Sequence, residues 1–196
     1  MAAKPELILD IAGVLTANFS PVFWQQLSSN HNVPYETLIT FKKDIREKLW
    51  TGKIKETEFW IRLGEQFPSI DIKDAQLMMR TCIKPLPAIK KVPFWSQFAN
   101  IHLLSNHRAE WIGPIINPIR NYVTSIAISS QTGCCKPQAE IYVTVNSSLK
   151  NKENVLFIDD QEKNFKEARQ LGWYTLLADK ESNWIKKVMP ILKEKI

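Results

Sequence analysis

Short, mostly apolar runs of four or five residues occur once near the start of the chain and four times after residue 100. Runs of this length, bounded by polar or turn residues, are typical of strands that are buried on both faces of a parallel sheet. They predict five strands, at Leu7–Ile11, Ile101–Leu104, Ser125–Ile128, Val155–Ile158 and Tyr174–Leu177.

Segments of helical length separate the last four strands and follow the final one, at 107–120, 137–149, 161–171 and 181–194. Strands that alternate with helices indicate a parallel sheet joined by right-handed crossovers. We therefore expect an α/β fold with a Rossmann-like parallel sheet sandwiched by helices.

The interval between the first two strands departs from this alternation, because it is far longer than an ordinary crossover and has no strand pattern. Its pattern predicts helices at 21–31, 34–50, 55–67 and 73–83, and the second has an apolar stripe at Leu38, Phe41, Ile45 and Leu49. We expect an inserted helical cap domain at 17–84. The core domain would then comprise 1–16 and 85–196, with a helix at 86–98.

The expected cap is rich in aromatic residues, namely Phe23, Trp24, Trp50, Phe59, Trp60 and Phe67. Aromatic residues at helical spacing more often form the interior of a helical subdomain than a platform for a ligand. Phe19 and Trp24 follow the first strand closely, so they are candidates to line an entrance to the core.

Composition and charge exclude several classes of protein. The 196 residues are 44% hydrophobic and 23% charged, which is ordinary for a globular chain. A net charge of +6 is too small to indicate a nucleic-acid partner. We find no apolar run of the ~20 residues that a membrane span needs, and no signal-peptide pattern. Three cysteines without metal-ligand spacing favour a reducing, cytoplasmic location.

Polar residues suited to phosphoryl transfer stand where the predicted strands end. They are Asp10, Ser105 with Asn106, Lys136 before Pro137, the pair Asp159 and Asp160, and Asn164 one helical turn later. Ligands of open parallel sheets bind at the carboxyl ends of the strands, so these side chains are expected to converge at one edge. A carboxylate, a hydroxyl, a cation and a carboxylate pair suit a nucleophile, a phosphate clamp and a magnesium site.

With these four motifs in this order, the sequence resembles the haloacid dehalogenase-like (HAD) hydrolase superfamily, in the subfamily with a helical cap after the first motif. The resemblance spans nearly the whole chain. It implies that Asp10 is the catalytic nucleophile and forms an aspartyl-phosphate. Ser105 and the backbone amide of Asn106 would bind the phosphoryl oxygens, together with the turn Ala12-Gly13, and the catalytic Lys136 would neutralise the charge.

The resemblance also implies a Mg²⁺ site. Asp10, the carbonyl oxygen of Ala12 and Asp160 would bind the ion directly. Asp159 would take part through water or as a neighbour of the ligands, and Asn164 would orient the carboxylate pair. Hard oxygen ligands of this kind suit Mg²⁺, which relieves the repulsion between the adjacent carboxylates.

The sequence departs from the family pattern at Ala12, where its phosphatases usually have a second aspartate. That aspartate protonates the leaving oxygen and then deprotonates water, a contribution of roughly 10²–10⁴-fold that a methyl group cannot make. The expected function is a phosphatase of a small phosphorylated metabolite, with a sugar phosphate as a candidate because the segment 159–164 is similar to the sugar-phosphatase branch.

Four explanations of Ala12 stay open. The leaving group needs little protonation, or the reaction is C–P cleavage, as in phosphonoacetaldehyde hydrolase, which shares the Asp-x-Ala-Gly pattern. Alternatively, the protein is a non-catalytic or weakly active module that binds a phosphorylated ligand, or the alanine was introduced to trap a complex.

His107 and Arg108 follow the second motif directly. His107 is a candidate supporting residue that donates a proton or contacts an anion, since histidine titrates in the useful range. The alternative places both residues on the exposed first turn of a helix. A closed cap favours a small soluble substrate, and the chain is expected to be a monomer or a homodimer.

Overall fold

The computed structural model describes residues 3–194 and contains one parallel sheet of five strands in the order β3-β2-β1-β4-β5. The strands are β1 (Glu6–Leu9), β2 (Asn100–Ser105), β3 (Ser125–Ile128), β4 (Val155–Asp159) and β5 (Tyr174–Leu177). All five predicted strands are confirmed, with ends that shift by one or two residues. The α/β class with a Rossmann-like sheet is also confirmed.

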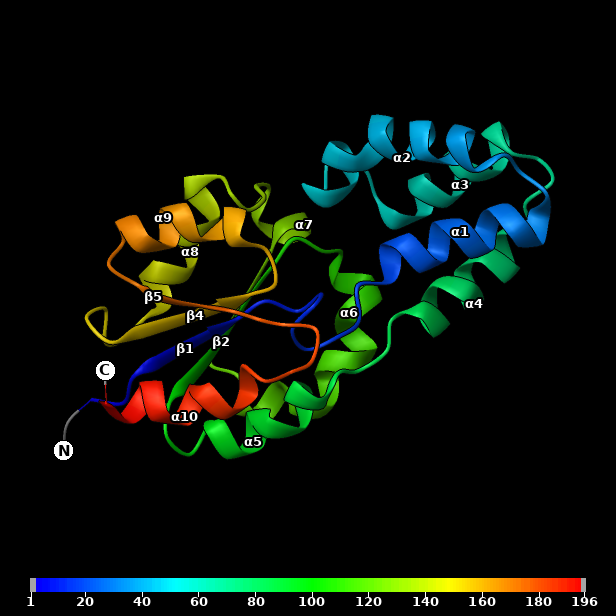
Figure 1. Cartoon of the computed structure of the whole chain (residues 1–196). Helices are drawn as coiled ribbons and strands as arrows, with labels where there is room; N and C mark the ends of the chain where they lie inside the picture. Colours follow the sequence, from blue (N-terminus) through cyan, green and yellow to red (C-terminus); the bar gives the residue numbers. More distant parts are fainter. Residues whose placement is uncertain (1–2, 195–196) are drawn as a thin grey trace.

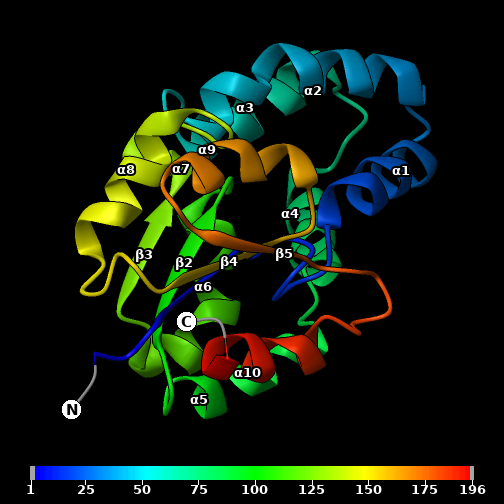
Figure 2. The ribbon, with the colours of Figure 1, turned by 60° about the vertical axis from the view of Figure 1, so that its left-hand side comes forward.

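Helices cover both faces of this sheet (Figures 1 and 2). One layer contains α8 (Ala139–Ser148) and α9 (Phe165–Gln170), and the other contains α5 (Val92–Trp95), α6 (Ala109–Ile116) and α10 (Ile185–Glu194). Successive strand residues point to opposite layers. On β1, Leu7 and Leu9 therefore pack in one core cluster and Ile8 in the other.

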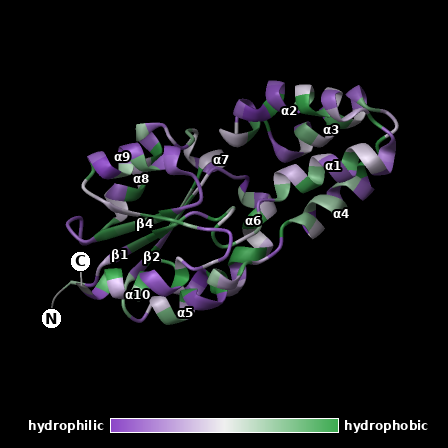
Figure 3. Cartoon of the chain, viewed as in Figure 1, coloured by the Kyte–Doolittle hydropathy of each residue, from purple (hydrophilic) through white to green (hydrophobic). Residues whose placement is uncertain are grey.

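The strands are mostly apolar, whereas the outer faces of the helices are largely hydrophilic (Figure 3). The central strands β1, β2 and β4 are buried on both faces, as their apolar runs predict, and the edge strand β5 is partly exposed. One charged exception is Glu6, which is fully buried. Its carboxylate accepts hydrogen bonds from Asn100 Nδ2 and from the backbone amides of Lys150 and Asn151, and pairs with His102 Nε2 at 2.6 Å.

Four helices between β1 and β2 stand beyond one end of the sheet (Figure 1). They are α1 (Phe19–His31), α2 (Tyr35–Trp50), α3 (Glu56–Gln66) and α4 (Ile72–Cys82), and they match the four predicted cap helices within two residues. Their apolar faces form a separate cluster, into which the stripe on α2 is buried. Residue Trp111 of α6 joins this cluster from the core side.

Several core helices differ from expectation because proline or side-chain caps interrupt them. The segment 86–98 is a 3₁₀ helix, Pro87–Lys91, followed by the short α5, which has Pro93 in its first turn. Segment 107–120 splits into α6 and the 3₁₀ helix Asn117–Tyr122. In the final segment, α10 begins only at Ile185, after a turn that the Asp179 carboxylate caps.

The remaining short helices are α7 (Ser129–Thr132) and the 3₁₀ turn Glu162–Asn164. Within the described residues, no helix is both long and apolar enough to cross a membrane.

Candidate functional site

The strand order determines which motifs become neighbours. Because β1 lies between β2 and β4, the residues that end these three strands share one edge of the sheet. Asp10 directly follows β1, Ser105 is the last residue of β2, and Asp159 is the last residue of β4. All three side chains are buried. The carboxyl ends of these strands therefore present polar groups in an otherwise apolar core.

Lys136 joins this group from the loop before α8. Its ammonium lies 3.0 Å from Asp10 Oδ2 and 2.5 Å from Asp159 Oδ2, and its side chain is 1% exposed. Burial by itself would lower the pKa of Lys136, but the two carboxylates outweigh it and raise that pKa. Lys136 is therefore a fixed positive charge between two strand ends.

Asn106 fixes the loop that carries Lys136. Its side-chain amide donates to the carbonyl of Lys136 at 2.8 Å, and its Oδ1 accepts from the amide of Lys136 at 2.7 Å. A role for the Asn106 side chain in positioning the cation was not foreseen from the sequence, where only its backbone amide was considered.

Asp159 is held from several sides. Asn164 Nδ2 donates to both carboxylate oxygens, at 2.9 and 3.0 Å, and the amide of Gln161 donates to Oδ1 at 2.8 Å. Tyr142 in turn donates its hydroxyl to the carbonyl of Asn164 at 2.7 Å. Lys136 lies on the other side, so protein donors contact both carboxylate oxygens of Asp159. This arrangement suits a residue that positions the Lys136 ammonium.

Asp160 differs from its neighbour because it is only half-buried and has a single long hydrogen bond, 3.4 Å from Gln161 Nε2. Oxygen atoms of Asp10, Asp159 and Asp160 lie within 4.8 Å of one another. Three carboxylates face one ammonium, so the cluster carries an excess of negative charge that a divalent cation would balance. Oxygen donors are those that Mg²⁺ prefers.

Burial makes Asp10 a weaker acid than an ordinary aspartate. Burial raises the pKa of Asp10 to about 7; Lys136 opposes this shift and Asp159 adds to it. Burial also raises the pKa of Asp160, and the charge of Asp159 adds to that shift. A nearby cation would favour the ionised form of both groups and keep Asp10 ionised at neutral pH.

Ala12 and Gly13 form the tight turn that leads out of this edge, where the amide of Gly13 donates to the carbonyl of Thr16 at 2.7 Å. Gly13 has φ +86°, and a Cβ atom there would collide with the carboxylate of Asp160. Glycine is therefore required both by the backbone angle and by the close approach of the acid.

Ser105 is suited to bind an anion. Its hydroxyl is buried beside Asp10, close enough to lower the pKa of that carboxyl, but within the described chain its Oγ has no partner at full hydrogen-bond geometry. Buried hydroxyls are usually satisfied, so an unsatisfied one at the edge of a charged site indicates that a ligand supplies the missing partner.

His107 and Arg108 are buried, at 1% and 4% exposed, so the alternative that places them on an exposed first turn is wrong. The His107 ring packs between Phe19 and Trp50, with centroid separations of 5.2 and 5.4 Å. Burial lowers the pKa of His107 to about 4. The ring is therefore neutral at pH 7 and holds no proton to donate beyond the one on its neutral tautomer.

Arg108 links the core to the cap. Its guanidinium donates to the carbonyls of Leu49 and Ile54 at 3.2 and 2.7 Å, and it pairs with Glu110 at 2.6 Å. These carbonyls flank the turn between α2 and α3. Local sequence contains no signal for this contact, since carbonyls far along the chain are involved.

The aromatic residues of the cap are mostly interior, as expected. Phe23, Trp24, Phe59, Trp60 and Phe67 are buried in one cluster, and Trp50 packs against it. Trp111 was missed by the sequence analysis, and its indole donates to Glu56 at 2.8 Å across the boundary between cap and core.

A pocket of about 430 Å³ reaches the carboxylate cluster at Asp160. Gly13, Asn18, Lys180 and Trp184 are among the residues that line it. The loop after β5 thus borders the site, although the sequence analysis named no residue there.

Known structures share this architecture. A predicted HAD-like family hydrolase of Porphyromonas gingivalis matches with a TM-score of 0.78 at 21% identity, over 98% of this chain and 100% of that one. A HAD family enzyme of Bacteroides thetaiotaomicron, as a magnesium complex, matches with a TM-score of 0.78 at 19% identity, over 95% and 99%. An aspartate-to-alanine mutant of it, in complex with magnesium and inorganic phosphate, has a TM-score of 0.73 at 20% identity, over 93% and 97%.

Sequence comparison adds one curated relative and no family model. The Bifunctional epoxide hydrolase 2 of Rattus norvegicus is 29% identical over 122 residues, which are 59% of this chain and 22% of that protein. The match thus spans about a fifth of the rat protein's length. Together with the solved structures, the topology and the geometry at the strand ends show that the chain has the fold of the haloacid dehalogenase-like hydrolases.

Proposed function

We propose that the chain is a Mg²⁺-dependent phosphatase of a small phosphorylated metabolite. The observation that carries this proposal is the meeting of Asp10, Lys136 and the two carboxylates Asp159 and Asp160 at one sheet edge. Sugar phosphates belong to this class of substrate.

Mg²⁺ fits the residues that are present, because the cluster offers only oxygen ligands and an excess of negative charge. Asp10, Asp160 and the carbonyl of Ala12 would hold it. When bound, the ion supplies charge stabilisation for the phosphoryl oxygens. The Bacteroides protein forms complexes with magnesium and inorganic phosphate both as the wild type and as an aspartate-to-alanine mutant, which supports this part of the proposal.

The protein's own residues have distinct tasks. Asp10 Oδ1 accepts the Ile11 amide at 2.6 Å, and Oδ2, which Lys136 holds at 3.0 Å, attacks phosphorus to form an aspartyl-phosphate. The leaving oxygen departs with the electrons of the P–O bond. Lys136 offsets the charge that gathers on the transferred group, and the free hydroxyl of Ser105 donates to one of its oxygens. Water then hydrolyses the acyl phosphate.

Proton transfer is the atypical step. Ala12 cannot protonate the leaving group, and His107 is neutral and enclosed by aromatic rings. Substrates whose leaving group needs little protonation, such as glycosyl, acyl or aryl phosphates, are therefore expected to react best.

A screen of small phosphate esters with Mg²⁺ tests the proposal, comparing the wild type with Asp10→Asn. Asp44→Asn, an exposed carboxylate of α2, is the matched control. We expect turnover in the wild type and the control, and none above background in Asp10→Asn. Binding of Mg²⁺ and phosphate without any turnover would instead identify a phospho-ligand-binding module.

A further inference from the structure

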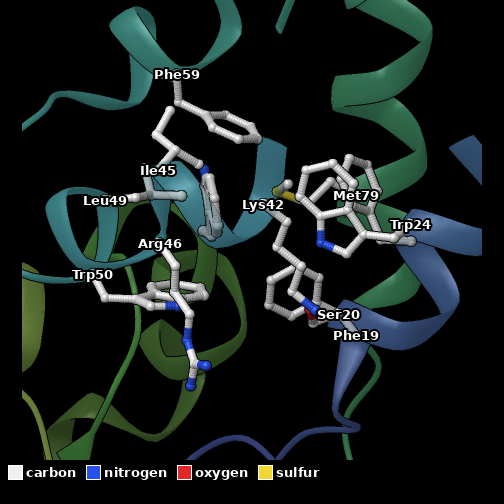
Figure 4. Close-up of a pocket in the computed structure, with 12 residues that line it drawn as sticks. Phe19, Ser20, Trp24, Lys42, Ile45, Arg46, Leu49, Trp50, Phe59 and Met79 are labelled. Atoms are coloured by element: carbon white, nitrogen blue, oxygen red, sulfur yellow. The ribbon is translucent and has the colours of Figure 1, made fainter. Parts of the chain in front are cut away.

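Two cations of the cap line a cavity at the boundary with the core, and among the described residues neither has a counter-charge. Lys42 and Arg46 are four residues apart on α2, and both line a cavity between the cap and α6 together with Phe19, Ser20 and Trp111. In Figure 4, Lys42 extends from α2 toward Phe19 and Ser20 at the start of α1, whereas Arg46 extends away from α2 on the side of Trp50. Among the described residues, neither forms an ion pair or a hydrogen bond.

The two positive charges disfavour each other, although Arg46 is exposed and solvent partly screens its charge. Like charges four residues apart on a helix repel each other. Lys42 is half-buried, and burial lowers its pKa, with a further contribution from the charge of Arg46. The carboxylates of α2 do not compensate, because Asp44 lines a different surface with Lys48 and Glu47 pairs with Lys53 at 3.5 Å.

The cavity that these cations line borders the loop after β2. Two of its lining residues, Phe19 and Trp50, pack on the ring of His107 at 5.2 and 5.4 Å, and His107 follows Ser105 by two residues. Phe19 and Ser20 begin α1, whose N-cap residue Asn18 makes no side-chain capping bond. The free amides of that helix start add a further preference for negative charge.

We propose that Lys42 and Arg46 bind a second anionic group of the substrate, which makes the preferred substrate a phosphate ester with a distal carboxylate or phosphate. This inference rests on the proposed function, since it takes the phosphoryl group to lie at Asp10 and Lys136. The enclosed part of the cavity is only about 20 Å³, roughly the room of one water molecule. The anion therefore binds at the rim, where the two cations stand, and the apolar rings of Phe19 and Trp50 flank the chain between the two charged groups.

Calorimetry with non-hydrolysable phosphonates tests the inference without relying on turnover. The probes are carboxyalkylphosphonates with two to four carbons, compared with alkylphosphonates of equal length, all with Mg²⁺ present. The proteins are the wild type, the double variant Lys42→Met/Arg46→Met, and Lys43→Met/Lys48→Met. The last pair are exposed lysines of the same helix that do not line the cavity, so the change in net charge is identical.

We expect the wild type and the control to bind at least one carboxyalkylphosphonate about tenfold more tightly than its alkyl counterpart. The double variant should lose this preference yet bind alkylphosphonates as before. An unchanged preference in the double variant, or none in the wild type while alkylphosphonates bind, would overturn the inference and leave the phosphatase proposal standing. If neither series binds, the proposed phosphate site fails and the inference fails with it.

Discussion

The ammonium of Lys136 lies 3.0 Å from Oδ2 of Asp10, and both groups are almost completely buried. The same ammonium contacts Asp159, so one cation pairs with carboxylates at the ends of two strands, β1 and β4. A pair this deep is held together only if its charges stay balanced, because an isolated buried charge is very costly. The chemistry of the site and the stability of the fold are therefore coupled at this point.

Replacing Lys136 with Met should destabilise the protein as well as inactivate it. The substitution leaves two buried carboxylates without their cation, and breaking such a pair costs about 3–5 kcal/mol. Urea unfolding at pH 7 without Mg²⁺ measures the free energy of unfolding of each variant. Lys163→Met, an exposed lysine near the same site, should change it by less than about 0.5 kcal/mol. Similar losses in both variants would mean that the ion pair is not a stabilising contact.

Ala12→Asp should increase the hydrolysis of alkyl phosphates by about 10²-fold, the lower end of what general acid–base catalysis contributes. The gain should be smaller for p-nitrophenyl phosphate, whose leaving group needs little protonation. Steady-state kcat for the two ester types gives the comparison, and Ala12→Asn controls for side-chain size. Equal rates in Ala12→Asp and the wild type would show that another group already supplies the proton.

Gly13→Ala should weaken Mg²⁺ binding at least tenfold, because its Cβ would displace the carboxylate of Asp160. Gly133→Ala is a close control, since Gly133 has a similar φ of +79° and a Cβ atom there would meet nothing within 4 Å. Both variants should lose about 1–2 kcal/mol of stability from backbone strain. Titration calorimetry measures the Mg²⁺ affinity of the two variants, and only Gly13→Ala should bind more weakly. Equal affinities would argue against Asp160 as a ligand.

Stability should fall in acid partly through His107. Its folded pKa of about 4 lies below the ordinary value of ~6.5, so the unfolded chain binds the proton more readily. The stability that comes from keeping His107 neutral is complete above pH ~6.5 and disappears as the pH falls toward 4. About 2 kcal/mol of unfolding free energy is lost between pH 7 and pH 5. His107→Asn, which keeps an acceptor for the Arg108 amide, should show a shallower decline in urea unfolding. Parallel curves for the two proteins would refute the prediction.

Arg108→Met should loosen the contact between cap and core. The carbonyls of Leu49 and Ile54 would lose their donor, at a cost of about 2 kcal/mol or more in unfolding free energy. Hydrogen exchange should accelerate in the turn between α2 and α3. Arg62→Met breaks an exposed pair with Glu58 and should have little effect on either measure. Unchanged exchange in the Arg108 variant would count against its role as a link.

Much of this protein can be predicted from local sequence. Mostly apolar runs locate all five strands, because a strand in the interior of a sheet covered on both faces has few polar residues, each of which needs a partner, as Glu6 and His102 have. The switch to Asp10, Ser105 and Asp159 at the strand ends identifies the polar edge for the same reason. The four cap helices follow from helical periodicity within two residues of their observed ends.

Only the tertiary structure decided which of these groups touch. Strand order places β1 between β2 and β4, and that order brings Lys136 to both Asp10 and Asp159. His107 looks like an exposed first-turn residue until the cap aromatics close over it, and Lys42 looks like a solvated charge until its half-buried place beside the cavity is seen. Burial and charge balance depend on contacts between segments far apart in the chain, which local patterns do not contain.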